Sequence, residues 1–226
     1  MPMHGEGFEQ LLIGIGITLD EGMLHAFEQF EEDLYRSNAV MNLTRVPREE
    51  CYLRHFLDSL LFHDLIPAGA SVLDIGTGPG FPAWPLALCR KDLHVLALDS
   101  SGKMLGFLRR HPLPNLEVVQ ERAEEWGVRD RFDVVTGRAV APLALQLELS
   151  AAPCKREGLV LPMRTPQDRA EIDRLSENSL GLVLEQVHER TLPELGAPRI
   201  FPAFRKVKST PAQFPRNWGE MKRRPL

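Results

Sequence analysis

The 226-residue chain has no long apolar run and little cysteine. Its apolar stretches fall far short of the roughly 20 residues that a membrane-spanning helix needs, so we expect no span. The first ten residues lack a basic segment followed by an apolar core, so we expect no export signal and a cytoplasmic location. Cys51, Cys89 and Cys154 match no metal spacing, and the seven histidines form no His-x-x-x-His pair, so we expect inert thiols and no metal site.

The charges are unevenly distributed along the chain. The net charge of −4 argues against a protein that coats nucleic acid non-specifically, but residues 199–226 hold eight basic residues and one acidic residue. Phe214 and Trp218 lie among these bases, and basic residues next to aromatic ones suit RNA contact. A solvated tail is the alternative. The residues we expect to contact RNA are Lys206, Lys208, Arg216, Lys222, Arg223 and Arg224.

Residues 71–80 read SVLDIGTGPG and are the most informative stretch. The apolar run Ser71–Ile75 predicts a buried parallel strand, and the glycines after it allow a sharp turn close to a ligand. Their G-x-G-x-G spacing differs from the G-x-G-x-x-G of dinucleotide sites, and no Lys-Ser/Thr pair follows, which excludes a nucleoside-triphosphate loop. Asp74 beside the turn suits a cationic ligand such as S-adenosylmethionine. A tight strand-to-helix turn without a ligand is the alternative.

Three further strand ends carry groups that suit a nucleoside. Asp99 follows His94–Leu98, and a carboxylate at the end of the second strand accepts hydrogen bonds from ribose hydroxyls. Ala123–Glu124, after the run 116–119, is expected beside the adenine, and Arg138 follows the run 132–136. Because the carboxyl ends of parallel strands meet at one edge of a sheet, these groups predict a nucleoside site there.

Strands and helices alternate from Ser71 onward, which predicts an α/β fold with a doubly wound, mainly parallel sheet. Residues 1–66 are expected to form a helical cap packed on the main domain, 67–208 a Rossmann-like domain, and 209–226 a basic tail. Thr18-x-x-Glu21 reads as a capping box that opens a helix. Pro202 in the last expected strand, Arg199–Arg205, indicates an edge position or a bulge.

The expected helices are 7–13, one from the capping box, 48–63, 83–89, 103–110, 143–152 and 169–176. The expected strands are 71–75, 94–98, 116–119, 132–136, 158–162, 182–187 and 199–205. Arg54 and Asp58 are four residues apart in the third helix and so share one face of it, with His55 adjacent; a surface ion pair between them is the alternative.

These stretches together resemble the bacterial 16S ribosomal RNA guanine-N7 methyltransferases, the glucose-inhibited division protein B family. The resemblance covers the chain from about Phe8 to Leu226. The matching motifs are Asn42-Leu43-Thr44, Arg54-His55-x-x-Asp58-Ser59, Asp74-Ile75-Gly76-Thr77-Gly78-Pro79-Gly80-Phe81-Pro82, Leu98-Asp99-Ser100, Arg122-Ala123-Glu124-Glu125 and Arg138-Ala139.

The resemblance implies a class I S-adenosylmethionine-dependent methyltransferase fold and transfer of a methyl group to N7 of a guanine in 16S rRNA. It implies that Gly76, Phe81, Ala123, Glu124 and Arg138 contact the cofactor. With the residues of the glycine turn and the second strand end, the expected cofactor set also includes Asp74, Thr77, Gly78, Gly80, Asp99 and Ser100. The chain departs from the family pattern at Ala83, Arg164 and Pro202.

Guanine N7 carries a lone pair and no proton, so an in-line methyl transfer needs no general base. We therefore expect Arg138, Asn42, Arg54 and His55 to position the reactants rather than to move protons. The expected partner is 16S rRNA or the assembling small ribosomal subunit, and the expected state is a monomer. Three alternatives stay open: a small-molecule methyltransferase, a non-catalytic assembly factor that binds RNA and S-adenosylmethionine, and a nicotinamide oxidoreductase.

Overall fold

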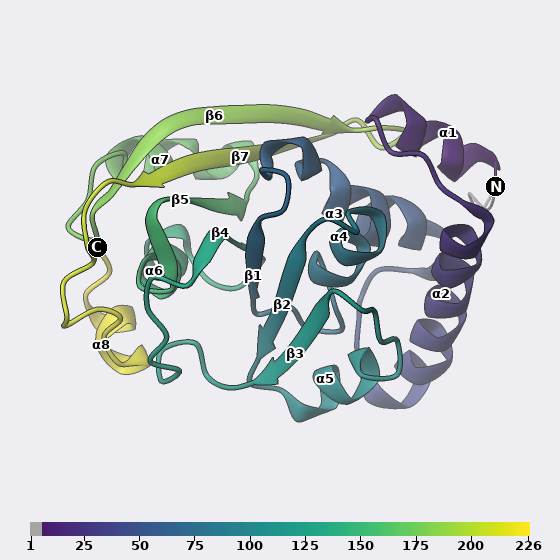
Figure 1. Cartoon of the computed structure of the whole chain (residues 1–226), viewed down its shortest axis with the longest axis horizontal. Helices are drawn as coiled ribbons and strands as arrows, with labels where there is room; N and C mark the ends of the chain where they lie inside the picture. The colour runs from purple at the N-terminus through teal and green to yellow at the C-terminus, as the bar shows by residue number, and fades with distance from the viewer. Residues whose placement is uncertain (1–5) are drawn as a thin grey trace.

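Seven strands form one sheet in the computed structural model, which describes residues 6–226 (Figure 1). Their order is β3-β2-β1-β4-β5-β7-β6, and the first five strands of the chain run parallel while β7 and β6 are antiparallel to their neighbours. The order reverses between β1 and β4, which is the place where open parallel sheets bind ligands. The strands are β1 (Ser71–Ile75), β2 (His94–Asp99), β3 (Leu116–Gln120), β4 (Phe132–Arg138), β5 (Cys154–Met163), β6 (Leu182–Leu192) and β7 (Ala197–Lys206).

Helices cover both faces of the sheet. Side chains alternate along β1, so Val72 packs into a core with the N-terminal helices while Leu73 and Ile75 pack into a second core with the later helices. Among residues 6–226, no helix has both the length and the apolar character to cross a membrane. The α-helices are α1 (Glu6–Gly14), α2 (Glu21–Met41), α3 (Asp58–Leu60), α4 (Ala83–Cys89), α5 (Gly102–Leu108), α6 (Leu143–Ala151), α7 (Arg169–Arg174) and α8 (Trp218–Arg223), with a π-helical turn at Tyr52–Leu57 and 3₁₀ turns at Arg48–Glu50, His63–Leu65 and Pro166–Asp168.

A cluster of aromatic rings joins the N-terminal helices to the main domain. Phe27 of α2 lies 4.7 Å from Phe56 and 5.6 Å from Trp84 of α4, measured between ring centroids. Phe30, one turn further along α2, lies 4.2 Å from Trp84 and 5.1 Å from Phe107 of α5. These rings are buried and belong to the same core as β1 and β2, so residues 6–66 complete one face of the sheet.

The long helix α2 begins at a different residue from the one that its sequence suggested. Asp20, not Thr18, is the N-cap, and its carboxylate accepts a hydrogen bond of 2.8 Å from the backbone N–H of Met23. The capping-box prediction was therefore wrong, because a carboxylate two residues closer to the helix satisfies the same free N–H groups. Asn42 ends α2 in the left-handed conformation, with φ of 49°.

Pro202 lies on β7, which is an inner strand between β5 and β6, so the edge position was a wrong prediction. Pairing of β5 with β7 is recorded at Leu159–Arg205 and Val160–Phe204 and resumes at Arg164–Ile200. The same register places Pro162 opposite Pro202, and neither proline has an N–H to donate. The sheet tolerates Pro202 because the ladder is already interrupted there.

The C-terminal segment is packed on the main domain rather than extended into solvent. Met221 of α8 is fully buried, and Phe214 is nearly so, both in the core that α6 shares with β1. The structure brings α8 beside α6, at the end of the sheet away from α1 (Figure 1). The solvated-tail alternative is therefore wrong.

Candidate functional site

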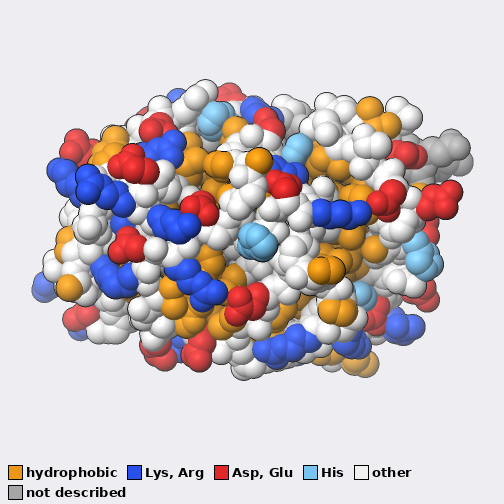
Figure 2. All heavy atoms as spheres, viewed as in Figure 1, with side chains coloured by type: hydrophobic (Ala, Val, Ile, Leu, Met, Phe, Trp, Pro, Cys, Tyr) orange, Lys and Arg blue, Asp and Glu red, His pale blue; other side chains and the backbone are white. Residues whose placement is uncertain are grey.

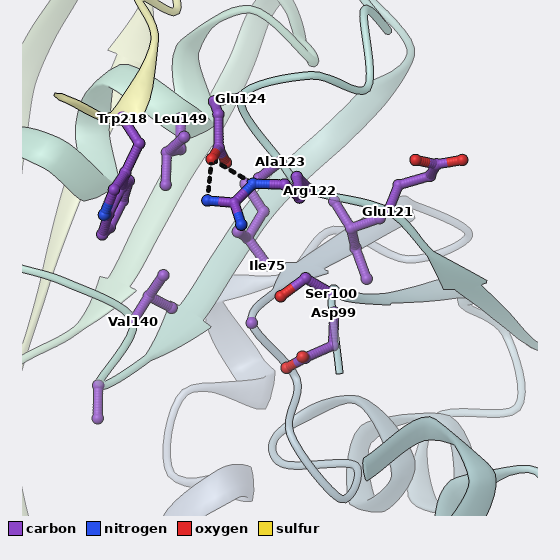
Figure 3. Close-up of a pocket in the computed structure, with 13 residues that line it drawn as sticks. Ile75, Asp99, Ser100, Glu121, Arg122, Ala123, Glu124, Val140, Leu149 and Trp218 are labelled. Atoms are coloured by element: carbon purple, nitrogen blue, oxygen red, sulfur yellow. Dashed lines mark hydrogen bonds and ion pairs between the residues drawn. The ribbon is translucent and has the colours of Figure 1, made fainter. Parts of the chain in front are cut away.

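A cavity of about 330 Å³ opens at the carboxyl edge of the sheet, where the strand order reverses (Figure 3). Its wall is formed by the ends of β1 and β2 and by the segments that follow β3 and β4, and α6 and α8 close one side. Five predicted cofactor residues line it: Gly76, Asp99, Ser100, Ala123 and Glu124. The other lining residues are Ile75, Leu98, Glu121, Arg122, Ala139, Val140, Leu149 and Trp218.

Backbone hydrogen bonds hold the glycine turn against the end of β2. The N–H groups of Gly76 and Thr77 donate to the carbonyl of Leu98 at 2.8 and 3.1 Å. Gly76 has φ of +67°, and a Cβ there would lie 3.0 Å from Cγ2 of Val140 across the cavity. A side chain at this position would therefore be strained and would crowd Val140, so the turn can lie this close to Val140 only with a glycine.

Asp99 fastens the glycine turn as well as lining the cavity. One carboxylate oxygen accepts a hydrogen bond of 2.9 Å from Gly78 N–H, and the other accepts one of 2.8 Å from Ser101 N–H. Each oxygen has a second lone pair, so the fixed carboxylate can still accept hydrogen bonds from two hydroxyl groups. This is the arrangement that a ribose at the end of the second strand requires.

The other predicted residues of the glycine motif lie behind the turn and do not line this cavity: Asp74, Thr77, Gly78, Gly80 and Phe81. Asp74 is fully buried, and its Oδ2 accepts a hydrogen bond of 3.1 Å from Ala83 N–H at the start of α4. Burial raises the pKa of Asp74 to about 7. At Gly80 a Cβ would lie 2.7 Å from Cδ1 of Leu108, so this glycine allows α5 to pack against the turn.

A second cavity of about 290 Å³ adjoins the first, and Ala139 lines both. Three arginines surround it, which makes it a candidate site for RNA. Arg138 is the last residue of β4, Arg164 follows β5, and Arg199 belongs to β7. The remaining lining residues are Asp58, Met163, Thr165 and Asp168.

The Arg138 guanidinium is held by groups from the N-terminal part of the chain. It donates to the carbonyl of Arg54 at 2.8 Å and to Nδ1 of His55 at 3.1 Å. It also lies over the ring of Phe81, with 5.2 Å between its central carbon and the ring centroid. The fixed guanidinium can donate hydrogen bonds but cannot accept a proton, as expected for a positioning group.

His55 is buried and uncharged in this arrangement. Its ring stacks on Phe81 at 4.2 Å with an interplanar angle of 3°, and its Nε2 lies 2.7 Å from the hydroxyl of Thr44. Because Arg138 donates to Nδ1, the single ring proton is on Nε2 and is donated to Thr44. Burial and the neighbouring Arg138 charge lower the pKa of His55 to about 3.

Asp58 pairs with two arginines that are distant in sequence, so the alternative of a surface pair with Arg54 is wrong. The carboxylate is buried and accepts two hydrogen bonds from Arg199, at 2.8 and 3.3 Å, while Arg138 lies at 3.7 Å. Arg54 is exposed and pairs with Glu50 at 3.0 Å. Among the positioning residues, the structure brings His55 to Arg138 by its side chain and Arg54 by its carbonyl only, and leaves the side chain of Asn42 exposed at the end of α2.

Arg164 and Trp218 are site residues that the sequence reasoning did not assign. Arg164 is buried and donates to the carbonyl of Ala141 at 2.9 Å and to the side chain of Gln146. Trp218 comes from the C-terminal helix and enters the first cavity. Arg164 was visible only as a departure from the family pattern, and Trp218 only as an aromatic residue among bases.

Two of the six predicted RNA-binding residues are engaged inside the protein. Lys206 is fully buried, and its Nζ donates to Asp130 at 2.7 Å and to the carbonyl of Cys154 at 2.6 Å. Arg216 pairs with the buried carboxylate of Glu148 at 2.5 Å. The prediction was wrong for Lys206 because local sequence cannot reveal a distant partner. Lys208, Lys222, Arg223 and Arg224 are exposed.

The exposed charges on the face shown in Figure 2 alternate in sign. Basic side chains there are interspersed with acidic ones rather than gathered into a single basic patch (Figure 2). On this face the protein therefore offers local phosphate contacts, not a continuous basic surface.

The sheet order, the cavity where that order reverses and the fixed carboxylate after β2 define a class I methyltransferase. Solved structures agree on the fold. TYW2 of M. jannaschii in complex with AdoMet superposes with a TM-score of 0.54 at 18% identity, covering 66% of this chain and 75% of that one. A predicted O-methyltransferase of Agrobacterium tumefaciens gives a TM-score of 0.51 at 19% identity, covering 69% and 81%.

Sequence comparison identifies the family within this class. The profile of the family described as "rRNA small subunit methyltransferase G" matches residues 23–199. The protein named "Ribosomal RNA small subunit methyltransferase G" from Bacillus velezensis is 35% identical, covering 99% of both chains, and the one from Bacillus subtilis is 33% identical with the same coverage. The chain belongs to the rRNA small subunit methyltransferase G family. The predicted fold, family and class of enzyme are confirmed.

Proposed function

We propose that this enzyme transfers a methyl group from S-adenosylmethionine to N7 of a guanine in 16S rRNA. The observation that carries the proposal is the pair of adjoining cavities that share Ala139. The first is built for a nucleoside, and the second is lined by three arginines. A methyl group passing between two such ligands has to cross beside Ala139.

The first cavity suits S-adenosylmethionine in shape and in charge. Gly76 lets the turn pass close to Val140, and Asp99 presents oxygens fixed by two backbone N–H groups. Glu124 is paired with Arg122 at 2.6 Å, so Asp99 and Glu121 are the lining carboxylates that suit a ligand carrying an ammonium and a sulfonium. When bound, S-adenosylmethionine supplies a methyl group that is activated by the positive charge on sulfur.

The protein's contribution to the reaction is positioning. The S–CH3 bond breaks as the N7–CH3 bond forms, and the positive charge passes to the guanine ring, with no proton removed at N7. His55 needs to accept no proton, and both its nitrogens are engaged, with Arg138 and Thr44. Arg138, held by the Arg54 carbonyl and His55, presents a fixed donor beside Ala139. Correct orientation alone can contribute about 7–11 kcal/mol to such a reaction.

The guanine has to be exposed to enter this site. In A-form RNA, N7 lies in a groove too narrow for side chains, so the target must be unstacked or in a loop. Arg138 and Arg199 are each only partly exposed and flank the second cavity, where they can meet a base or its phosphate. We propose 16S rRNA or the assembling small subunit as the substrate, and a cytoplasmic monomer as the acting species.

The direct test is methylation with tritiated S-adenosylmethionine. Purified protein is incubated with naked 16S rRNA and, separately, with small ribosomal subunits, and the labelled nucleotide is mapped by chain cleavage specific for 7-methylguanosine. We expect one labelled guanine. Label on another atom or base, or no label in either substrate, would contradict the proposal.

The same assay separates the alternatives. A small-molecule methyltransferase would turn over without RNA, and an assembly factor would bind S-adenosylmethionine and RNA but transfer no label. A nicotinamide oxidoreductase would bind NADH, which a fluorescence titration detects. Deleting residues 216–226 is a poor test here because it removes Arg216 and the buried Met221 along with the exposed bases.

A further inference from the structure

The cavity at the carboxyl edge has an aromatic wall that comes from the C-terminal helix. Trp218 of α8 and Leu149 of α6 lie across the cavity from Asp99 and Ser100 (Figure 3). The family profile ends at residue 199, so the match to the family assigns no role to Trp218.

Trp218 is held in place by an internal ion pair. Arg216, two residues earlier, donates to the Glu148 carboxylate through its backbone N–H at 2.8 Å, through Nε at 2.9 Å and through a terminal nitrogen at 2.5 Å. Glu148 is 1% exposed and precedes Leu149, which lines the cavity itself. Met221, one turn after Trp218, is fully buried. The position of the indole is thus fixed by Arg216 before it in the chain and by Met221 after it, without a ligand.

One face of the Trp218 indole is covered by the Lys222 ammonium group, and another part of the ring lines the cavity. Lys222 Nζ lies 5.3 Å from the ring centroid, over one face of the indole. Lys222 is exposed and does not line the cavity, so the ring meets the cavity with its other face or an edge. The neighbouring lining side chains of Leu149 and Val140 are apolar.

We propose that Trp218 packs against the adenine of S-adenosylmethionine and makes the C-terminal segment part of the cofactor site. Asp99 marks the ribose, which lies in the middle of the ligand, and Ala139 marks the methyl end, so the base extends the other way, past Ala123 to the apolar wall of Leu149 and Trp218. A purine has two apolar faces, which an aromatic ring and aliphatic side chains can cover. This inference rests on the proposed function, because it needs S-adenosylmethionine in this cavity.

Binding measurements on Trp218 variants test the proposal. S-adenosylhomocysteine and 5′-methylthioadenosine, which lacks the amino-acid part, are titrated by calorimetry into the parent protein, Trp218→Phe and Trp218→Ala. We expect Trp218→Ala to weaken both ligands by the same factor, about tenfold or more, and Trp218→Phe to keep most of the affinity, because stacking on an aromatic ring depends on the base alone. Trp84→Phe is the matched control, since Trp84 packs on Phe27 and Phe30 and lines neither this cavity nor the neighbouring one, which Trp126 lines.

Fluorescence gives a second readout that does not depend on the alanine variant folding. The chain has three tryptophans, Trp84, Trp126 and Trp218, so most of the ligand-dependent quenching should persist in Trp84→Phe and be lost in Trp218→Phe. Undiminished quenching in Trp218→Phe, or unchanged affinity in a folded Trp218→Ala, would overturn the proposal while leaving the proposed function intact. If the parent protein bound neither ligand, the proposed function itself would fail.

Steady-state kinetics separate a cofactor contact from an RNA contact. We expect Trp218→Phe and Trp218→Ala to raise the KM for S-adenosylmethionine and to leave the KM for RNA unchanged. A rise in the KM for RNA alone would assign Trp218 to the RNA side and overturn the inference.

Discussion

His55 is enclosed between an aromatic ring and a guanidinium, and its environment fixes both its charge and its tautomer. Phe81 covers one face of the imidazole, and Arg138 uses Nδ1 as an acceptor. A proton on Nδ1 would remove that acceptor and place two positive charges in contact. His55 thereby ties the conformation of Arg138 to the N-terminal helices through the hydroxyl of Thr44.

Replacing His55 by Phe should weaken the dependence of stability on pH and reduce turnover. The pKa of His55 is lowered to about 3, so its contribution to stability is complete above the ordinary value of 6.5 and is lost as the pH falls towards 3. Phe keeps the stacking but not the acceptor, so kcat should fall by about tenfold as Arg138 loses its position. Urea unfolding at several pH values and single-turnover assays measure the two effects.

The exposed His25 provides the control, and His25→Gln should leave kcat unchanged. Equal kcat of His55→Phe and the parent enzyme would show that the position of Arg138 does not depend on the hydrogen bond to His55.

Asp74 shows the opposite dependence on pH. Burial raises its pKa to about 7, so the folded protein holds this proton more tightly than the unfolded chain and stability falls as the pH rises from about 4 to 7. Asp74→Asn keeps an acceptor for Ala83 N–H without the charge. We expect the variant to be more stable than the parent at pH 8, by at most about 4 kcal/mol. Chemical denaturation at pH 5 and pH 8 tests this, and a variant less stable than the parent at pH 8 would argue against a buried charge.

At the scale of elements, the C-terminal segment depends on one ion pair. Arg216→Ala would leave the Glu148 carboxylate without its partner while only 1% of its side chain is exposed. We expect a loss of about 3–5 kcal/mol in the free energy of unfolding, as for other buried pairs broken on one side. The exposed Arg223 serves as the control, and Arg223→Ala should change stability by less than about 0.5 kcal/mol. Similar unfolding curves for Arg216→Ala and Arg223→Ala would show that the Arg216–Glu148 pair does not stabilise the fold.

We expect the exposed bases of the same segment to contact RNA rather than to hold the fold. Replacing Lys222, Arg223 and Arg224 together by Gln removes three exposed charges and leaves Arg216 and Met221 in place. RNA affinity should fall several-fold at low salt, and the slope of log affinity against log salt should decrease by about one for each phosphate that the variant no longer neutralises. Filter binding over a salt series measures both quantities. An unchanged slope would mean that these residues do not touch phosphate.

At the scale of the whole molecule, the N-terminal helices and the sheet share one core. Phe27 and Phe30 of α2 pack on Trp84 of α4, and these rings are buried together with β1 and β2. We expect the full chain to unfold in a single cooperative transition by fluorescence and by circular dichroism. A fragment of residues 67–226 should expose this apolar face and fail to unfold cooperatively. Two separate transitions in the full chain would instead make residues 1–66 an independent domain.

Much of the fold could be predicted from the sequence, because local pattern determines it. The bounds of β1 and α4 match their predicted ranges, since short apolar runs bounded by glycine and charge define both. The start of α2 was missed because Thr18 and Asp20 are both good caps and only the fold selects between them. The inner position of β7 depends on pairing with β5, which leaves no mark in the sequence of β7.

The site was predictable where a strand end fixes the residue and not where a distant partner does. Gly76, Asp99, Ala123 and Glu124 line the cavity because each follows its strand. Lys206 and Asp58 were misread, since their partners lie 76 and 141 residues away along the chain. Trp218 lines the cavity because the C-terminal segment packs beside α6, whereas the sequence suggested that this segment is a tail.

Ala139, whose side chain is a single methyl group, lines both cavities. Its backbone has φ of 53°, a left-handed conformation that few residues with a Cβ adopt. A branched side chain at this position would be strained and would obstruct the passage, while glycine would widen it and leave the segment less rigid. The width of the opening between the proposed S-adenosylmethionine cavity and the proposed RNA cavity therefore depends on the small side chain of Ala139.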